Sequence, residues 1–322
     1  MRPLLTEDTV FLADIRETND AFRITTEVDK DSEQLVASLA EVGLMTPLIL
    51  KKDASGGHII VTGFRRLAAL KTLGVDAALC RLLSPDTSAL DCLKLAITDN
   101  VFQRPLNPGE QARALSLLAP FFDDPDHLRE MAASLLLPSS RAEIDKLQKA
   151  AGLPSRLFDY FTCEQIPLSI AVILAGLDES AALMLADIFT GLKLGVNKQR
   201  ESLTLIEEIA VREDKTLMQV FEDDSLRQIV DDDQADRGRR AADLRSWLRQ
   251  RRFPAITQKQ AWFSKQNKAL KLGNRMSLSP PANFEGVDYI LQMTFRDLEE
   301  LETHARRLAE IAGNPTMKEL LS

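Results

Sequence analysis

The chain has 322 residues, 45% of them hydrophobic, which is enough to bury a sizeable core in two or three domains and argues against a disordered chain. Its net charge of -8 argues against a protein that coats nucleic acid through bulk positive charge. Aromatic residues make up only 6%, which disfavours a base-stacking platform for single strands.

The first block, residues 1–105, is predicted to alternate short strands with helices. A capping-box start at Asp31–Gln34 introduces a helix that ends at Gly43. Two apolar strands follow, Leu48–Leu50 and His58–Val61, which are joined by the turn-like segment 53–57. A helix at Phe64–Leu73, closed by a glycine, and a further strand at Ala77–Leu83 come next. This density of alternating elements predicts a compact α+β domain.

The second block, residues 106–195, is predicted to be helical. Asn107 as the N-cap, Pro108 at the first helical position and Glu110 three residues after the cap form a strong helix start. Ser140–Glu143 repeats the capping-box pattern further along.

The third block, residues 196–252, is predicted to be a long, charged helical region. Its acidic residues are Glu207, Glu208, Asp223, Asp224 and Asp231–Asp233. A basic run follows: Arg237, Arg239, Arg240, Arg245, Arg249, Arg251 and Arg252. Such blocks usually form solvated helix faces that pair with each other. The arginines could contact a phosphate backbone, or could equally pair with Asp231–Asp233.

The last block, residues 253–322, is predicted to be a small α/β module. Ser277–Ala282 is loop-like, Val287–Phe295 alternates as a strand does, and Arg296–Ala312 has the apolar spacing of a helix.

A candidate phosphate site lies where the strand at His58–Val61 runs through Gly63 into a helix. Such a turn points the free N–H groups and the positive dipole end of the helix at an anion, and glycine lets the backbone approach closely. Arg65 and Arg66 add positive charge, and Thr62 adds a hydroxyl donor. The alternative is a surface helix with two solvated arginines.

Asp99 and Asn100 lie near the end of another predicted helix. Their oxygen atoms are the ligands that Mg²⁺ prefers, and Mg²⁺ normally accompanies the phosphates of a nucleotide. Arg104 adds a further cation. Ordinary helix capping is the alternative for this pair.

Together, these segments resemble the ParB partition proteins of the ParB/sulfiredoxin fold. Thr62–Ala69 is similar to their Gly-Glu-Arg-Arg-x-x-Ala box, and Asp99–Glu110 is similar to their Glu-Asn-x-x-Arg box with the Leu-Asn-Pro-x-Glu that follows. Gly43–Leu50 is similar to the Gly-x-x-x-Pro strand segment. Order and spacing agree over Ile15–Glu110.

This resemblance implies a pocket for CTP, or another nucleotide, with Mg²⁺. By position, Gly63, Arg65 and Arg66 would hold phosphates, while Thr46 and Pro47 would line the base pocket. Asn100 would bind Mg²⁺, with Asp99 beside it. Arg23, Arg104 and the hydroxyl of Thr62 complete the expected ligands of the nucleotide.

The sequence departs from the family pattern at several of these positions. The box glutamate is Phe64, the second-box glutamate is the shorter Asp99, and Gln103 occupies the place expected for the arginine found at Arg104. The segment beginning at Asn19 lacks the glutamine implicated in hydrolysis. These departures favour a binding switch over an enzyme, with at most weak CTP hydrolysis.

A helix-turn-helix pair, which follows the nucleotide domain in ParB proteins, is predicted at His127–Leu136 and Arg141–Ala151. The second helix offers DNA-contacting side chains at Arg141, Lys146, Gln148 and Lys149. Glu143 and Asp145 lie among them and would repel phosphates, so a helical scaffold is the alternative.

Three functions remain open at this point. The first is a nucleotide-gated, DNA-binding protein of the partition or plasmid-regulation type, with a homodimer and a partition ATPase as possible partners. The second is a phosphotransferase or weak hydrolase on the same fold, for which Asp99 is the candidate base. The third is an interaction module that has lost DNA binding.

The expected location is the cytoplasm, on the nucleoid if the protein binds DNA. The three cysteines Cys80, Cys92 and Cys163 fit no metal spacing, and their number is odd, as in proteins of a reducing compartment. No apolar run approaches the roughly 18 residues of a membrane span, and acidic residues near the start argue against a signal peptide.

Overall fold

The computed structural model describes residues 5–16, 20–25, 32–53 and 56–321. These residues divide into two compact units, Met1–Arg200 and Glu201–Ser322. The boundary falls five residues from the predicted start of the charged helical region, while the finer division into four domains stays a prediction. Among the described helices, none is long and apolar enough to cross a membrane.

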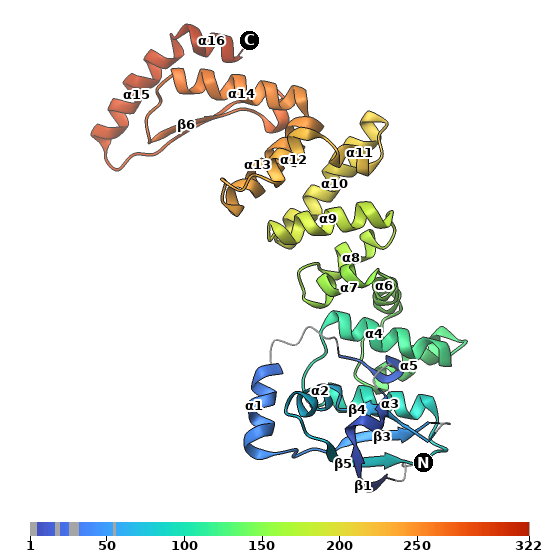
Figure 1. Cartoon of the computed structure of the whole chain (residues 1–322). Helices are drawn as coiled ribbons and strands as arrows, with labels where there is room; N and C mark the ends of the chain where they lie inside the picture. The colour runs from blue at the N-terminus through green and yellow to red at the C-terminus, as the bar shows by residue number, and fades with distance from the viewer. Residues whose placement is uncertain (1–4, 17–19, 26–31, 54–55, 322) are drawn as a thin grey trace. The chain divides into compact units, whose positions relative to one another are not determined.

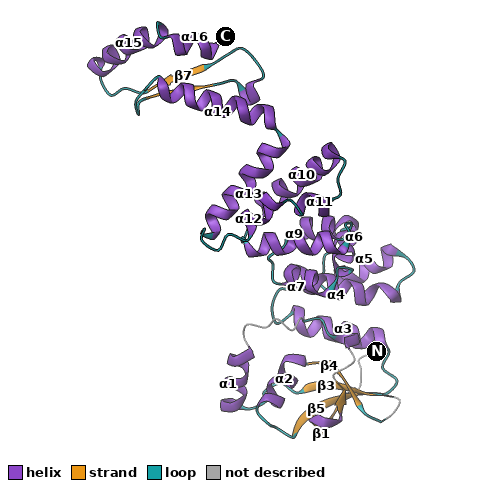
Figure 2. Cartoon of the chain, turned by 45° about the horizontal axis from the view of Figure 1, so that its top comes forward, coloured by secondary structure: helices purple, strands orange, loops and turns teal. Residues whose placement is uncertain are grey.

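The first unit begins with a mixed five-stranded sheet in the order β1-β5-β3-β4-β2 (Figures 1 and 2). β1 is antiparallel to β5, β3 is parallel to β5 and antiparallel to β4, and β2 is parallel to β4. The strands are β1 (Leu5–Phe11), β2 (Ile15–Arg16), β3 (Leu48–Lys52), β4 (His58–Thr62) and β5 (Ala77–Leu83). The three strands expected from sequence are confirmed.

Three helices accompany the sheet, and a helix was expected at each of these places. They are α1 (Ser32–Val42), α2 (Phe64–Thr72) and α3 (Ala89–Val101). α1 packs on α2, α2 on β3 and α3 on β4. Gly43 and Gly74, which end the first two helices, have φ values of 74° and 70°, a conformation that favours glycine. Asp31, the predicted cap of α1, lies outside the described residues.

The core of this domain forms between the sheet and the helices. Leu48, Leu50 and Ile60 on the central strands are fully buried, and Leu67 and Leu70 of α2 pack against them. Alternate apolar positions on β3 and two turns of α2 therefore fix the strand-to-helix turn of the candidate phosphate site.

Six helices complete the first unit: α4 (Pro108–Leu118), α5 (Pro125–Ser134), α6 (Arg141–Ala151), α7 (Ser155–Thr162), α8 (Leu168–Leu174) and α9 (Glu179–Gly191). The predicted start of α4 is confirmed, because Asn107 Oδ1 accepts from the Glu110 N–H at 2.9 Å and Glu110 Oε2 accepts from the Asn107 N–H at 3.0 Å. The middle region is thus mostly helical, as expected.

The region expected to be charged and helical contains four helices: α10 (Val196–Glu213), which crosses the boundary between the two units, α11 (Leu217–Phe221), α12 (Asp224–Val230) and α13 (Arg237–Arg252). Thr216 caps α11 through a capping box, and Asp223 and Asp236 cap α12 and α13. Asp223, which the sequence analysis placed among the charged surface residues, is therefore a helix cap whose carboxylate accepts a hydrogen bond from the Ser225 N–H group.

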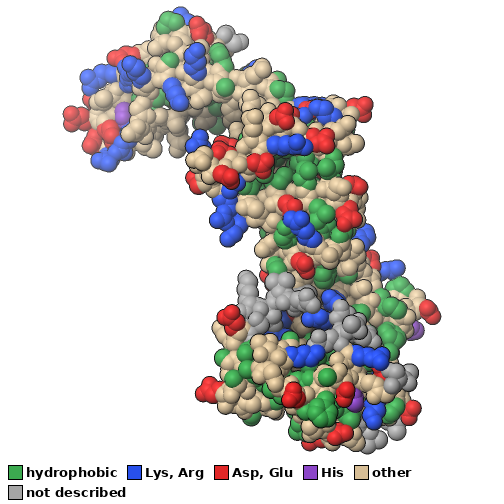
Figure 3. All heavy atoms as spheres, viewed as in Figure 1, with side chains coloured by type: hydrophobic (Ala, Val, Ile, Leu, Met, Phe, Trp, Pro, Cys, Tyr) green, Lys and Arg blue, Asp and Glu red, His purple; other side chains and the backbone are tan. Residues whose placement is uncertain are grey.

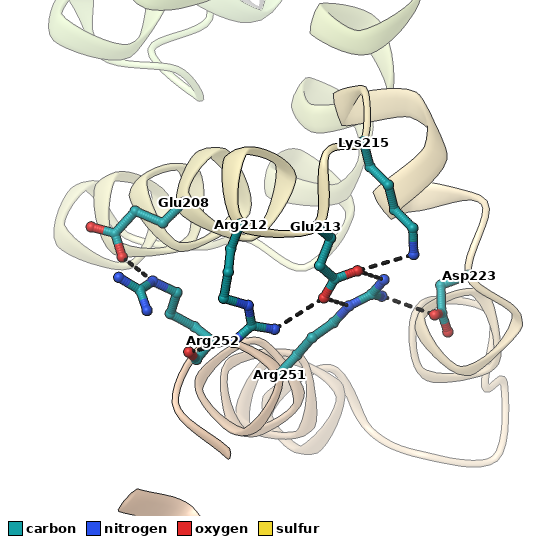
Figure 4. Close-up of polar contacts among 7 residues, drawn as sticks. All are labelled: Glu208, Arg212, Glu213, Lys215, Asp223, Arg251 and Arg252. Carbon is teal, nitrogen blue, oxygen red and sulfur yellow. Dashed lines mark hydrogen bonds and ion pairs between the residues drawn. The ribbon is translucent and has the colours of Figure 1, made fainter. Parts of the chain in front are cut away.

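Five of the seven arginines on α13 pair with acids, and among the described residues none of these acids is Asp231–Asp233, the partners that the sequence offered as one alternative. Figure 4 shows the pairs of Arg251 and Arg252. Arg245 and Arg249 both contact Glu201, and Arg252 contacts Glu208. The acids on α10 recur at the spacing of two helical turns, which places them opposite the arginines of α13.

Arg251 and Glu213 are the centre of this network. Arg251 contacts Glu213 at 2.7 Å and Asp223 at 2.8 Å, while Lys215 and Arg212 also reach Glu213 (Figure 4). The hydrogen bond from Arg251, followed by those from Lys215 and Arg212, outweighs the opposing effect of burial and holds the pKa of Glu213 well below its usual range.

Replacing Glu213 with glutamine should reduce the stability of the second unit at neutral pH by up to about 1 kcal/mol. A carboxyl group whose pKa is lowered by folding contributes stability that is present above its unfolded pKa of about 4.3 and is lost as the pH falls toward the folded value. The Glu213→Gln variant should therefore lose less stability than the wild type between about pH 5 and pH 2. Thermal melting followed by circular dichroism across this range measures both effects.

Glu222→Gln is the matched control, since Glu222 is exposed on the same unit and no ion pair is recorded for it with any described residue. Its acid profile should match the wild type. Identical profiles for all three proteins would contradict the assigned role of Glu213.

The second unit ends in a small module of helices and a two-stranded antiparallel sheet. Its elements are α14 (Pro254–Ala269), β6 (Met276–Ser279), β7 (Ile290–Met293), α15 (Leu298–Ala312) and α16 (Pro315–Leu321). Phe263, Leu270, Met276 and Ile311 are buried at its centre. The strand and helix expected from residue 287 onward are confirmed, whereas Ser277–Ser279, expected to be loop, lies in β6.

Candidate functional site

The turn at Gly63 brings a buried strand directly into the start of α2. β4 ends at Thr62, Gly63 adopts φ 97° and ψ 24°, and the first helical bond runs from the Leu67 N–H to the Gly63 carbonyl at 2.9 Å. The backbone N–H groups of the first helical turn have no intrahelical acceptor in this arrangement. The turn therefore presents donors and the positive end of the helix dipole at one point.

Gly63 is required here for two separate physical reasons. Its positive φ is a conformation that side chains rarely adopt. In addition, a Cβ at this position would lie 2.7 Å from Leu48 Cδ2 and 3.3 Å from the guanidinium of Arg66. A larger residue would therefore overlap Leu48 and crowd the guanidinium of Arg66.

Arg66 connects three segments of the domain. Its Nη1 donates to the carbonyl oxygens of Thr46 at 2.6 Å and Pro47 at 3.0 Å, and its Nη2 contacts Asp99 Oδ2 at 3.3 Å. Burial lowers the pKa of Arg66, and the nearby Asp99 carboxylate opposes that effect. One guanidinium thus fixes the segment before β3 and the end of α3 against the start of α2.

A pocket opens beside this guanidinium. It is lined by Thr25, Leu35, Gly63, Phe64, Arg65, Arg66, Asp99, Asn100 and Gln103. The two boxes found in the sequence therefore meet at one pocket. α2 contributes the cations, α3 contributes the carboxylate of Asp99 and the amide of Asn100, and the turn after α3 contributes the amide of Gln103.

Some of the predicted ligands have other neighbours. Thr62 is 2% exposed, does not line the pocket, and has a buried hydroxyl oxygen without a hydrogen-bond partner among the described residues. Thr46 and Pro47 meet Arg66 through their carbonyls, which does not test their predicted role beside a base.

Arg104 binds Glu110 instead of facing the pocket. The two form a bidentate pair with distances of 2.6 and 2.7 Å, and the Glu110 side chain is only 2% exposed. Gln103, one residue earlier, lines the pocket and donates to Asp99 Oδ1 at 3.2 Å. The amide of Gln103 therefore lies at the pocket, where the family pattern has an arginine. Arg104 instead holds the start of α4 through Glu110.

Phe64 and Arg23 form a contact at the edge of the pocket. The Arg23 guanidinium carbon lies 5.6 Å from the centre of the Phe64 ring, within the range of a cation–π interaction. The aromatic ring at the place of the family glutamate keeps a cation beside the pocket without adding a negative charge. Thr25 and Leu35 also line the pocket, and neither carried a signal in the sequence. Asn19 lies outside the described residues.

Asp99 and Asn100 could bind Mg²⁺ only if phosphates supplied further ligands. Within the described residues, no group of three or more His, Cys, Asp or Glu side chains could hold a metal by itself. Asn100 Nδ2 donates to the Ala96 carbonyl at 2.8 Å, which orients the amide. One carboxylate and one amide oxygen fit the usual Mg²⁺ arrangement, in which phosphates and water supply the other ligands.

The predicted helix-turn-helix corresponds to α5 and α6. Leu136, in the turn where a glycine is usual, has φ 58° and an exposed side chain. α6 buries Ile144, Leu147 and Ala150, which leaves its other face in solvent. That face carries Arg141, Asp145, Lys146 and Lys149, with Gln148 half-buried at its edge.

Comparison with known proteins finds a family match in the first domain. Residues 8–101 match the ParB N-terminal domain family. The chain is 30% identical over 178 residues to the probable chromosome-partitioning protein ParB of Campylobacter jejuni, covering 55% of this chain and 60% of that protein. It is 27% identical over 150 residues to the corresponding protein of Pseudomonas putida, covering 46% of this chain and 49% of that one.

The chain thus matches roughly half of the length of these relatives. Among solved structures, it is similar to the C-terminally truncated ParB of Caulobacter crescentus complexed with CTP-gamma-S, at 21% identity. That match covers 57% of this chain and 98% of the other, with a TM-score of 0.27.

Proposed function

We propose, from the ParB N-terminal domain at residues 8–101, that this chain binds a nucleoside triphosphate with Mg²⁺ in the pocket at Gly63–Arg66 and Asp99–Asn100. The base expected from the family resemblance is cytosine. Nucleotide binding would control the binding of this chain to DNA, as in a protein of the partition type. The observation that carries the proposal is the meeting of the α2 and α3 boxes at one pocket.

The charge around the pocket favours a phosphate ligand. Arg65 and Arg66 and the helix N-terminus of α2 face a pocket that contains one carboxylate, Asp99. A helix N-terminus beside arginines attracts anions through oriented N–H donors and bidentate guanidinium groups. Arg23 at the edge adds a further positive group within reach of the pocket rim.

The same geometry favours binding over turnover. Asp99, the one carboxylate among the described residues that line the pocket, accepts from Arg66 through Oδ2 and from Gln103 through Oδ1. Each oxygen of this carboxylate already accepts a hydrogen bond within the protein, so the carboxylate acts here as a structural acceptor rather than as a base positioned toward a substrate. The phosphotransferase alternative needs such a base, so it is the second choice.

The DNA-binding half of the proposal depends on α6 and on the relatives. The relatives are named as probable chromosome-partitioning proteins, and the exposed face of α6 offers Arg141, Lys146 and Lys149 to a groove or a phosphate backbone. A homodimer and a partition ATPase are the partners that this function would use.

Calorimetric titration of the full chain with CTP, ATP and GTP in Mg²⁺ tests the proposal. We expect CTP to bind more tightly than ATP or GTP. We also expect little release of nucleoside diphosphate during the titration. No binding of any nucleotide at millimolar concentration would refute the proposed site. Sustained turnover would instead support the phosphotransferase.

A further inference from the structure

A small groove lies between α5 and α6 and is separate from the nucleotide pocket. Its volume is about 190 Å³, and residues 119–123, which connect α4 to α5, contribute to its lining. Three apolar side chains line it: Phe122 is half-buried, Leu128 is 6% exposed and Ile144 is 5% exposed. We call these three residues the apolar floor. No residue of the groove lines the pocket at Gly63–Arg66.

The groove combines its apolar floor with charged groups that no other side chain holds. Charge alone does not single out a site on this protein, since side chains of both signs are scattered over the visible face in Figure 3. In the groove, Asp126 pairs with Arg129 at 3.2 Å. By contrast, no ion pair joins Asp123, Arg141 or Asp145 to another residue within the described part of the chain. Three charges in the groove are therefore available to a ligand.

Arg141 and Asp145 set the spacing of these charges. They lie four residues apart on α6 and both line the groove. Such residues are neighbours on a helix, with Cβ atoms about 5 to 6 Å apart, yet these two do not form an ion pair with each other. Arg141 is the first residue of α6, where the positive end of the helix dipole favours an anionic group. The groove thus offers a positive position at the start of α6, a negative position one turn later, and the second carboxylate of Asp123.

This lining matches a ligand that carries charges of both signs on neighbouring atoms and has an apolar part. A free α-amino acid with an apolar side chain has this chemistry, because its ammonium and carboxylate groups are attached to one carbon. The groove is smaller than the roughly 300 to 1,000 Å³ of pockets that take drug-sized ligands. A single amino acid therefore fits its size better than a dipeptide or a nucleotide.

Other small ligands leave part of the lining without a partner. A phosphate-bearing anion would pair with Arg141 but would lie beside the carboxylates of Asp123 and Asp145. An aliphatic diamine would pair with these carboxylates but would bring a second positive charge next to Arg141. A neutral apolar molecule would cover the floor and remove water from the charged groups without replacing it. A zwitterion gives each of the three charges a partner.

We propose that the groove between α5 and α6 binds a free L-α-amino acid with an apolar side chain. Its carboxylate accepts hydrogen bonds from Arg141, and its ammonium group donates to Asp123 and Asp145. Its side chain covers the apolar floor and displaces water from it. Arg141 is also one of the side chains proposed to contact DNA, so this consequence rests on the proposed function: the amino acid and DNA compete for one guanidinium. Binding of the amino acid itself requires neither DNA nor a nucleotide.

The test titrates the full chain with L-leucine and with L-phenylalanine, without DNA or nucleotide, and follows binding by ligand-observed NMR. We expect a Kd below about 1 mM, which is within reach of a ligand of this size. Glycine lacks the side chain, leucinol lacks the carboxylate and N-acetyl-leucine lacks the ammonium group. Each of these three should bind at least about tenfold more weakly than leucine.

Paired changes in the protein and the ligand assign each contact. Arg141→Gln should weaken leucine binding at least about tenfold and should no longer distinguish leucine from leucinol. Asp123→Asn combined with Asp145→Asn should weaken it similarly and should no longer distinguish leucine from N-acetyl-leucine. Because all three side chains are exposed, the melting curves should stay close to that of the wild type.

Glu130→Gln on α5 and Lys149→Gln on α6 are the matched controls. Both side chains are exposed on the two helices that form the groove, and neither lines it. Each variant removes one charge of the same helix, so each should bind leucine as the wild type does.

Four results would overturn the proposal. The first is no binding of leucine or phenylalanine at millimolar concentration. The second is equal affinity for leucine, leucinol and N-acetyl-leucine, which would show that the charges take no part. The third is undiminished leucine binding by the Arg141 and Asp123–Asp145 variants, which would place the ligand elsewhere. The fourth is tighter binding of the diamine putrescine than of leucine, which would identify a cation site. A failure of CTP to bind would refute the proposed function and leave these outcomes unchanged.

Discussion

Replacing Arg66 with alanine is expected to weaken nucleotide binding by at least about 100-fold, the largest effect of any single change in the pocket. The guanidinium would be lost as a phosphate donor. The carbonyls of Thr46 and Pro47 and the carboxylate of Asp99 would also lose their shared partner. The segment before β3 and the end of α3 would then no longer be held together at the pocket. Calorimetric titration with CTP and Mg²⁺ measures the loss.

Two further variants make this prediction specific. Arg66→Lys keeps the charge, but its single nitrogen cannot reach acceptors on both sides as Nη1 and Nη2 do, so it should recover only a small part of the affinity. Arg81→Gln removes an arginine from β5 of the same domain. Arg81 contacts Glu7 at 3.1 Å and does not line the pocket, so this variant should bind CTP as the wild type does. Equal Kd values for Arg66→Ala and the wild type would rule out the pocket.

Replacing Gly109 with alanine is expected to reduce the stability of the helical region by about 2 to 3 kcal/mol. Gly109 lies in the first turn of α4, where it is buried against the end of α7. An added Cβ would lie 2.4 Å from Thr162 Oγ1 and 2.9 Å from Thr162 Cα. The second atom is backbone, so a side-chain rotation cannot relieve the overlap and the two helices must separate. Thermal or urea unfolding followed by circular dichroism measures the change.

Gly191→Ala is the matched control, because a Cβ there meets nothing within 4 Å. Alanine favours a helix over glycine, so this variant should be as stable as the wild type or slightly more so. Combining Gly109→Ala with Thr162→Ala removes the hydroxyl but leaves the backbone overlap, so the double variant should recover only partly. Full stability in Gly109→Ala would show that α4 and α7 do not pack as closely as described.

The helix starts, helix ends and the strand-to-helix turn of this protein could be predicted from its sequence, because each depends on a few neighbouring residues. Asn107 and Glu110 cap α4 with their own side chains, and Gly43 and Gly74 end helices because they adopt positive φ. The run from β4 through Gly63 into α2 follows from an apolar strand, a glycine and a helical stripe. Such signals depend on chain neighbours alone.

Other elements formed only through distant partners. β1 is exposed at six of its seven positions and contains two acids, so its sequence alone does not favour a strand. It is a strand because it pairs with β5 along its whole length, where Glu7 meets Arg81. Similarly, the arginines of α13 and the acids of α10 lie about 40 residues apart in the chain, and only helix packing decided which acids they meet.

The sequence by itself determined the two boxes of the pocket, the strand-to-helix turn at Gly63 and the start of α4. The tertiary structure decided how those boxes meet. It directed Arg66 to Thr46, Pro47 and Asp99, and it turned Arg104 toward Glu110, leaving Gln103 at the pocket. A sequence specifies which side chains carry charge, but the acceptor that a long, flexible arginine reaches depends on packed backbone positions far away in the chain.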